Sequence, residues 1–258
     1  MPRIVCIIPA RYESTRFAGK PLADMGGKPM IQRVYERVLL CPLVREAAVA
    51  TDDERIVRAV EAFGGRVIMT AATQRSGTDR VAEAADSMEL DTTDIVVNVQ
   101  GDQPLVEPAQ IEEVTAPLLD DASLSFATLV YEIRRREEIT HPNAVKVVFD
   151  RDDFALYFSR STVPFARNDG DSRYYKHHGI YAYRRSFLSV FTGLETGRLE
   201  QIESLEQLRA LEHGYRIKVV ISAYDSPEVD TPEELRRAVD EMTGGSGKPG
   251  TIKRSMET

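Results

Sequence analysis

The sequence predicts an α/β fold, with a mostly parallel, doubly wound sheet and an antiparallel extension in the middle of the chain. Short apolar runs alternate with helical segments from residue 4 to about residue 120, the pattern of parallel strands joined by helices. The run 94–99 is apolar almost throughout, as expected of a central strand covered on both faces. From about residue 124 to 190, apolar runs follow one another without long helices between them. This change of pattern favours antiparallel pairing there.

The elements of the first half follow from apolar spacing and from capping residues. Apolar residues three and four positions apart share a helix face, and Asp52-Asp53 can cap a helix. A glycine pair, Gly64-Gly65, ends that helix. We therefore expect a strand at 4–8, a helix from Pro29 to about 40, a strand at 47–50, a helix at 54–63, a strand at 66–69, a helix carrying Val81 to Met88, a strand at 94–99 and a helix from Pro108.

The second half is predicted in the same way. We expect strands at 124–130, 145–149, 154–158 and 179–183, a hairpin turn at 150–153, a helix at 199–213 closed by Gly214, a strand at 216–221 and a helix that ends near Met242. We expect these elements to form one α/β domain over residues 1–242. Residues 243–258 are rich in Gly, Ser and Lys, and we expect a disordered tail.

Composition excludes several classes of protein. The chain has 258 residues, 42% hydrophobic and 29% charged, and its 41 acidic and 33 basic residues give a net charge of −8. No basic face for nucleic acid is expected from this balance, although a local cationic pocket remains possible because charges act over about 8–10 Å. The two cysteines form no metal or disulfide motif. No apolar run approaches the roughly 20 residues that span a bilayer. A cytoplasmic protein without membrane insertion is expected.

A polar, glycine-containing loop after the first strand carries three cations, Arg11, Arg16 and Lys20. The carboxyl ends of parallel strands share one sheet edge, where ligands of such folds bind. A polyphosphate site is therefore predicted, with a solvated surface loop as the alternative. Two phosphate motifs are absent: a P-loop ending at Lys20 would need Gly at 14 and Ser or Thr at 21, but the chain has Ser14 and Pro21. No GxGxxG follows the first strand.

Two aspartates are candidate magnesium ligands. Asp102 follows the strand 94–99 and Gly101, whose missing side chain leaves room for a ligand. Thr231 and Glu234 form a predicted capping box around Pro232, which leaves Asp230 outside the helix. Mg²⁺ favours a few carboxylates, water and substrate phosphates. The alternatives are a turn role for Asp102 and a second cap for Asp230.

Hydroxyl groups at Ser76 and Thr78 precede a helix, where they can recognise a base or a phosphate. An ordinary N-cap role for Thr78 is the alternative. His177 and His178 are adjacent, so on a strand they point in opposite directions and make no metal pair. A zinc site is not expected.

Several motifs together resemble the CMP-Kdo synthetases, or 3-deoxy-manno-octulosonate cytidylyltransferases. The segments that match this family in order are Ile8-Pro-Ala-Arg-Tyr-Glu-Ser-Thr-Arg-Phe-Ala-Gly-Lys-Pro-Leu, Ala50-Thr-Asp-Asp, Ser76-Gly-Thr-Asp-Arg, Asn98-Val-Gln-Gly-Asp-Gln-Pro, Asn143-Ala-Val-Lys, Leu156-Tyr-Phe-Ser-Arg, His178-Gly-Ile-Tyr, Leu205-Glu-Gln-Leu-Arg and Val229-Asp-Thr-Pro-Glu. The resemblance covers about residues 3–242. It implies transfer of CMP from CTP to the sugar acid Kdo, release of pyrophosphate and a role in lipopolysaccharide synthesis.

The resemblance also implies roles for single residues. Arg11, Lys20, Asp102 and Asp230 would be catalytic, and the two aspartates would hold Mg²⁺. The nucleotide would be bound by Pro9, Ala10, Arg11, Arg16, Lys20, Ser76, Gly77, Thr78, Arg80 and Gln100. The sugar acid would be bound by Gln103, Arg160, His178, Tyr181, Glu206 and Gln207. The family implies a homodimer with contacts in the region 124–190.

Three other functions stay open. The sugar could be the 8-amino form of Kdo, against which the positive charge of Lys176 would count if it faced the ligand. Sialic acid is another possible sugar acid. A nucleotide-binding regulator without catalysis is the alternative of a different class, although Lys20, Asp102 and Asp230 together speak against it.

Overall fold

One sheet organises the molecule. The computed structural model describes residues 1–13, 17–74, 76–168 and 172–243. The strands are β1 (Ile4–Ala10), β2 (Glu46–Thr51), β3 (Val67–Met69), β4 (Ile95–Val99), β5 (Phe126–Glu132), β6 (Lys146–Phe149), β7 (Ala155–Ser159), β8 (Tyr175–Arg184) and β9 (Lys218–Ile221). Their order is β3-β2-β1-β4-β8-β5-β9, and β6 pairs with β7 and β8 off this path. The predicted α/β class is confirmed.

Parallel pairing joins β1 to β2 and to β4, β2 to β3, and β5 to β9. The long strand β8 runs antiparallel to β4 and β5, and β6 and β7 form the predicted hairpin. The antiparallel extension is therefore confirmed. It adds to the parallel strands through β8.

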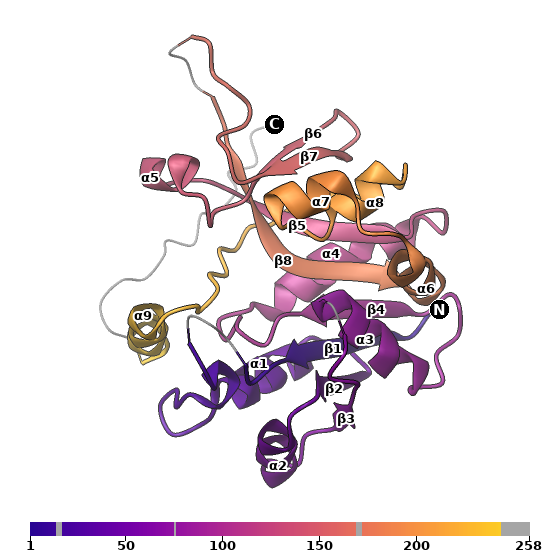
Figure 1. The fold of residues 1–258 in the computed structure, drawn as a ribbon, viewed down its shortest axis with the longest axis vertical. Coiled ribbons are helices and arrows are strands. Elements are labelled where there is room, and N and C mark those ends of the chain that lie inside the picture. The colour runs from indigo at the N-terminus through magenta and orange to yellow at the C-terminus, as the bar shows by residue number, and fades with distance from the viewer. Residues whose placement is uncertain (14–16, 75, 169–171, 244–258) are drawn as a thin grey trace, which may run out of the picture.

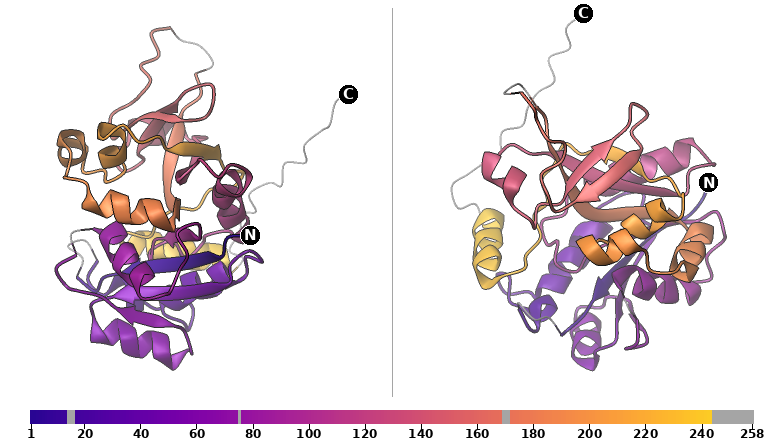
Figure 2. Two further views of the ribbon diagram at one scale, coloured as in Figure 1. Left: turned by 90° about the vertical axis from the view of Figure 1, so that its right-hand side faces the viewer. Right: turned by 45° about the horizontal axis from the view of Figure 1, so that its top comes forward.

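Helices cover both faces of the sheet. They are α1 (Met30–Leu39), α2 (Glu54–Ala62), α3 (Gly77–Asp86), α4 (Pro108–Asp120), α5 (Arg136–Thr140), α6 (Arg185–Gly193), α7 (Arg198–Glu203), α8 (Leu208–Glu212) and α9 (Pro232–Met242), with a short 3₁₀ helix, η1, at Lys20–Leu22. Figure 1 shows β1 to β4 with α1 to α3 in the lower part of the molecule and β5 to β8 with α7 and α8 in the upper part. Figure 2 shows the same arrangement from two other sides.

The alternation of buried residues along β1 explains why helices pack on both faces. Val5 and Ile7 belong to a core cluster that includes residues of α3, α6 and α8. Ile4, Cys6 and Ile8 belong to a second cluster that includes residues of α1, α2 and α4. Successive strand residues point to opposite faces, so a strand buried on both faces needs an apolar residue at nearly every position.

Three sequence predictions were wrong in detail. The predicted helix 199–213 is two helices, because Ser204 adopts a left-handed conformation (φ 52°) between α7 and α8. Ile202, in α7, is 66% exposed. β8 begins at Tyr175 rather than 179, and the helices α5 and α6 were not predicted. The predicted tail lies outside the described residues, apart from Thr243.

The strand ends place the polar loops. Ala10 at the end of β1 pairs with Thr51 at the end of β2, and Gln100 to Pro104 follow β4, the other parallel neighbour of β1. The two loops therefore leave one edge of the sheet, as predicted. Pro9 and Ala10 end β1 instead of beginning the loop. In the described part of the chain no helix has the length and apolar character needed to cross a membrane.

Candidate active site

A lysine and two aspartates meet at this edge of the sheet. Lys20 Nζ donates to Asp102 Oδ2 at 2.7 Å and to Asp230 Oδ1 at 2.9 Å. These residues come from η1, from the turn after β4 and from the residue before the N-cap of α9. Burial lowers the pKa of Lys20, but the two carboxylates outweigh burial, and the net effect is a raised pKa. The structure thus joins three of the four residues predicted to be catalytic.

Local backbone features bring these three side chains together. The Val229 N–H donates to the Asp102 carbonyl at 2.9 Å, which ties the segment before α9 to the turn after β4. Thr231 caps α9 in the predicted capping box, so Asp230 lies just outside the helix, as expected. A Cβ on Gly101 would lie 3.0 Å from the Pro9 carbonyl oxygen. This glycine therefore allows the ends of β1 and β4 to approach closely.

The two aspartates fit a magnesium ion. Both carboxylates converge on one cation, the Lys20 ammonium, and Asp102 Oδ1 is buried without a hydrogen-bond partner among the described residues. No cluster of three or more histidine, cysteine or acidic side chains suited to a metal occurs among those residues. Two carboxylates completed by water and substrate phosphates are a donor set that Mg²⁺ accepts.

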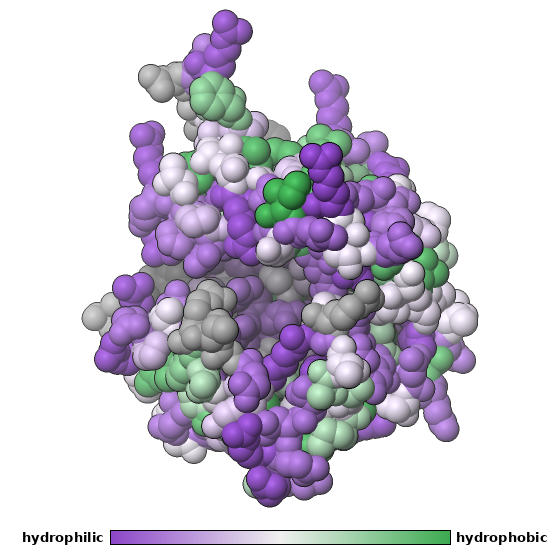
Figure 3. Space-filling model, viewed as in Figure 1, coloured by the Kyte–Doolittle hydropathy of each residue, from purple (hydrophilic) through white to green (hydrophobic). Residues whose placement is uncertain are grey.

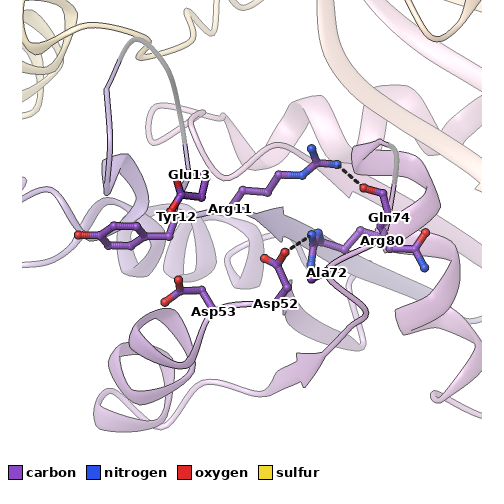
Figure 4. A pocket seen from close by; sticks show the side chains of 8 residues that line it. All are labelled: Arg11, Tyr12, Glu13, Asp52, Asp53, Ala72, Gln74 and Arg80. Atoms are coloured by element: carbon purple, nitrogen blue, oxygen red, sulfur yellow. Dashed lines mark hydrogen bonds and ion pairs between the residues drawn. The ribbon is translucent and has the colours of Figure 1, made fainter.

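A cavity of about 290 Å³ lies beside the end of β1. It is lined by Arg11, Tyr12, Glu13, Asp52, Asp53, Ala72, Gln74 and Arg80. Figure 4 shows Arg11 reaching toward the Gln74 carbonyl, which accepts from its Nη2 at 3.4 Å, and Asp52 pointing at Arg80. Arg80 and Arg11, both predicted to bind nucleotide, thus line one cavity. Arg16, also predicted there, lies outside the described residues.

Arg80 is held rigidly in the wall of this cavity. Its side chain is 1% exposed and its Nη2 lies 3.0 Å from Asp52 Oδ2, while its Nη1 donates to the Thr70 hydroxyl. Its Nε is buried without a partner in the described part of the chain. A fixed guanidinium offers directional donors to a planar, polar ligand.

The N-terminus of α3 connects the predicted nucleotide residues to the predicted sugar residues. Ser76 is the N-cap and accepts from the Asp79 N–H at 3.0 Å, so the alternative of Thr78 as the cap is wrong. The hydroxyls of Ser76 and Thr78 both donate to the Glu206 carboxylate, the latter at 2.9 Å. Burial raises the pKa of Glu206, and the two hydroxyls oppose this effect.

Two glutamine side chains near β8 have amide N–H donors that make no hydrogen bond to the described residues. A Cβ on Gly179 would lie 3.5 Å from Gln100 Cγ and 3.8 Å from Gln103 Nε2. Tyr181 donates to Gln207 Oε1 at 3.4 Å. The Nε2 atoms of Gln103 and Gln207 are buried and have no hydrogen-bond partner among the described residues. Unpaired buried donors are costly, and hydroxyl and carboxylate oxygens of a ligand would satisfy them.

The space-filling view shows a hollow between the upper and lower parts of the molecule, with mainly hydrophilic residues around it (Figure 3). Hydrophilic walls suit a charged, hydroxyl-rich ligand better than an apolar one. The hollow lies between the part of the sheet that carries β1 to β4 and the part that carries β5 to β8.

The side chains of Arg160 and His178 have partners outside the set of residues predicted to bind the sugar. The Arg160 guanidinium donates to the carbonyls of Glu203, Pro142 and Ser204. His178 Nε2 lies 3.5 Å from Asp225 Oδ1, and burial lowers the pKa of His178 to about 4. Among the described residues, neither side chain hydrogen-bonds to the other predicted sugar ligands. Their proposed roles depend on the geometry of the bound sugar.

Sequence reasoning missed two acidic residues. Asp52 was predicted only as a helix cap, but Asp53 is the cap of α2 and Asp52 pairs with Arg80. Its position after β2, at the same sheet edge, was the available signal. Glu228 Oε1 would lie 3.1 Å from a Cβ on Gly179, which places this carboxylate against β8 at Gly179. It lies two residues before Asp230, and nothing in the local pattern distinguished it.

The comparisons with known proteins agree with one another. The family model described as "Cytidylyltransferase" matches residues 5–217. The 3-deoxy-manno-octulosonate cytidylyltransferase of Syntrophus aciditrophicus is 67% identical over 95% of this chain and 99% of its own length. The 8-amino-3,8-dideoxy-manno-octulosonate cytidylyltransferase of Shewanella halifaxensis is 55% identical over 90% and 96%. A solved CMP:2-keto-3-deoxy-manno-octonic acid synthetase, complexed with CTP, has a TM-score of 0.89 at 46% identity over 94% and 99%.

Proposed function

The chain belongs to the cytidylyltransferase family, and on that premise we propose that it transfers CMP from CTP to Kdo. The products are CMP-Kdo and pyrophosphate. The observation that carries this proposal is the convergence of Lys20, Asp102 and Asp230 at the carboxyl edge of the parallel strands. A cation and two carboxylates at such an edge suit a nucleoside triphosphate with its metal.

The reaction is an in-line substitution at the α-phosphorus. The anomeric hydroxyl of the sugar attacks, the bond to the pyrophosphate oxygen breaks, and negative charge develops on the leaving group. Positioning and electrostatic stabilisation account for most catalysis in phosphoryl-type transfers. Mg²⁺ held by Asp102 and Asp230 would supply Lewis-acid activation of the attacking hydroxyl. The proton of the attacking hydroxyl leaves to solvent water, and no side chain is assigned as a dedicated general base.

The residues of the chain position the two substrates. Arg11 and Lys20 would neutralise the triphosphate, together with Arg16. The first turn of α3, with Ser76, Gly77 and Thr78, would hold the cytidine together with Pro9, Ala10, Arg80 and Gln100. Backbone N–H groups at a helix N-terminus favour polar and anionic groups, which supports this placement. The buried, unpartnered amide nitrogens of Gln103 and Gln207 support a site for a sugar acid, and Gln207 directly follows Glu206 in the chain.

We also propose a cytoplasmic homodimer that supplies CMP-Kdo for lipopolysaccharide synthesis. Residues 1–242 would form one domain, and its region 124–190 would make the dimer contact. Two large apolar side chains in that region support this: Phe165 is 85% exposed and Leu156 is 62% exposed. Burial of such side chains against a second copy would remove apolar surface from water.

The 8-amino sugar is a second candidate substrate, favoured by the identity to the Shewanella halifaxensis protein. The charge of Lys176 is no obstacle to it. Its ammonium lies 2.9 Å from both Glu138 Oε1 and Asp225 Oδ2. Two carboxylates therefore neutralise the one lysine that seemed unfavourable for an amine.

A substrate comparison tests the proposal. Pyrophosphate release with CTP and Mg²⁺ is measured with Kdo, 8-amino-Kdo or sialic acid as the acceptor, and kcat/KM is compared. We expect the highest value for Kdo. A higher value for the amino sugar would reassign the substrate within the same reaction, and no release with any acceptor, despite CTP binding, would exclude the enzyme.

A further inference from the structure

Lys20 occupies the position that the metal is proposed to take. Its Nζ lies 2.7 Å from Asp102 Oδ2 and 2.9 Å from Asp230 Oδ1. These carboxylates come from positions 82 and 210 residues away along the chain. The bond from the Val229 N–H to the Asp102 carbonyl joins their backbone segments, and the Lys20 ammonium joins the two carboxylates themselves. The side chains of Lys20, Asp102 and Asp230 are only 12%, 23% and 20% exposed, so water screens the two negative charges incompletely.

We propose that Lys20 is a positioning residue that holds the two metal-binding carboxylates together in the free protein, so that the divalent cation enters only with the nucleotide. This inference rests on the proposed function, because it takes Asp102 and Asp230 as metal ligands and Lys20 as a triphosphate ligand. It assigns Lys20 a second, earlier task at the same site.

Charge explains why the metal and the ammonium compete. Two carboxylates carry a charge of −2, which the lysine reduces to −1 in the free protein. A divalent cation bound beside the ammonium would place two cations against the same pair of oxygens. Mg²⁺ sits at about 2.0–2.1 Å from its oxygen ligands, and Asp102 Oδ2 and Asp230 Oδ1 already accept from the ammonium. A metal at these two oxygens therefore needs the ammonium to leave, and a metal at the unpartnered Asp102 Oδ1 would lie beside the ammonium and be repelled by it.

The nucleotide removes the ammonium from the carboxylates. Triphosphate oxygens accept hydrogen bonds from a lysine as well as carboxylates do, and the flexible four-carbon stem of lysine lets its ammonium reorient. Once the ammonium has moved to the phosphates, the two aspartates are available to the metal, whose other ligands include the same phosphates. By thermodynamic linkage, nucleotide then raises metal affinity and metal raises nucleotide affinity by the same factor.

Mn²⁺ binding without any sugar tests this inference. Free Mn²⁺ is measured by electron paramagnetic resonance with wild type and Lys20→Met, with and without CTP, and with a correction for Mn²⁺ bound by CTP alone. We expect weak Mn²⁺ binding to nucleotide-free wild type and an increase of about tenfold or more with CTP. Without nucleotide, Lys20→Met should bind Mn²⁺ about tenfold more tightly than wild type does. CTP should then increase the Mn²⁺ affinity of Lys20→Met by a smaller factor than that of wild type.

Three further variants make the test specific. Lys28→Met removes a lysine that pairs with Glu36 on the surface, and it should leave Mn²⁺ binding as in wild type. Asp102→Asn in the Lys20→Met background should abolish the gain, which assigns it to this pair of carboxylates. Lys20→Gln, checked by circular dichroism, replaces Lys20→Met if the latter does not fold.

An Mn²⁺ affinity of Lys20→Met equal to or weaker than that of wild type would overturn the inference. It would do so without touching the proposed function, because wild-type turnover with CTP and Kdo is a separate measurement. If wild type shows no turnover with CTP and Kdo while Lys20→Met still binds Mn²⁺ more tightly than wild type, the proposed function is rejected and the competition between metal and lysine stands.

Discussion

The Thr78 hydroxyl donates to the Glu206 carboxylate at 2.9 Å and thereby joins the N-terminus of α3 to the turn between α7 and α8. Ser76 donates to the same carboxylate. One buried acid thus connects the first turn of α3, proposed to hold the nucleotide, with the segment proposed to hold the sugar. Binding of both substrates should therefore depend on the Glu206 carboxylate.

Glu206→Gln should therefore weaken both substrates. The amide keeps the size of the side chain but has one acceptor oxygen in place of two, so it cannot satisfy both hydroxyls as well. We expect kcat/KM to fall by about tenfold or more for CTP and for the sugar acid. Steady-state kinetics with each substrate varied checks this. Glu233→Gln, which removes one partner of an exposed pair with Arg236, is the control, and unchanged kinetics in Glu206→Gln would reject the connecting role.

His177 should make the fold sensitive to acid. Burial lowers the pKa of His177 from 6.5 to about 3. A lowered pKa in the folded state means that the stability it contributes is present above pH 6.5 and is lost as pH falls toward 3. The free energy of unfolding should decrease by about 1.4 kcal/mol per pH unit for this group within that window.

His177→Asn should reduce this pH dependence in urea unfolding measured between pH 7 and pH 4. Thr128→Val removes the hydroxyl that lies 2.9 Å from His177 Nε2 but keeps the buried ring, so it should retain the wild-type slope. Parallel pH profiles for wild type and His177→Asn would contradict the expected role of His177.

Gly101→Ala should damage the site through the backbone. The added Cβ would lie 3.0 Å from the Pro9 carbonyl oxygen, so the ends of β1 and β4 must move apart and carry Asp102 with them. Small displacements of catalytic groups cost about a hundredfold in rate, and we expect a loss of that order in kcat/KM. Gly193→Ala is the matched control, because its Cβ meets nothing within 4 Å. Equal activity of both variants would show that this close approach is dispensable.

Arg160→Met separates a structural role from a binding role. Three main-chain carbonyls would lose a charged donor, which should reduce the free energy of unfolding by about 1–3 kcal/mol. If the guanidinium also binds the sugar carboxylate, KM for the sugar acid should rise while KM for CTP stays constant. Thermal unfolding and kinetics together decide, and a KM for sugar equal to that of wild type would leave Arg160 a structural role alone.

The sequence predicted the parallel part of the fold well because each strand there is a continuous apolar run followed by a polar turn. β4 and its turn, with Asp102, are an example. The prediction was wrong where the apolar spacing of a helix continues across a residue at which the helix ends. Leu199, Leu205 and Leu208 keep a helical spacing, but the left-handed conformation of Ser204 separates α7 from α8.

The candidate site was predictable where residues follow strands, as with Lys20 and Asp102, or lie just before a helix cap, as with Asp230. It was not predictable where a partner comes from a distant element. Nothing near Arg160 in the sequence indicates that its guanidinium would meet the carbonyls of Glu203 and Ser204. The contact between Thr78 and Glu206 spans 128 residues and depends on how the two parts of the sheet pack.

Cytidylyl transfer at Asp102 and Asp230 is tested most directly by comparing chemistry with binding in one variant. Pyrophosphate release from CTP in the presence of Mg²⁺ and Kdo is measured for wild type and Asp102→Asn, and CTP affinity is measured for both by calorimetry. We predict sugar-dependent release by wild type, a loss of about a hundredfold or more in Asp102→Asn, and a much smaller change in CTP affinity. Wild-type turnover in Asp102→Asn would contradict the proposed metal site, and no release by wild type that binds CTP would contradict the transfer itself.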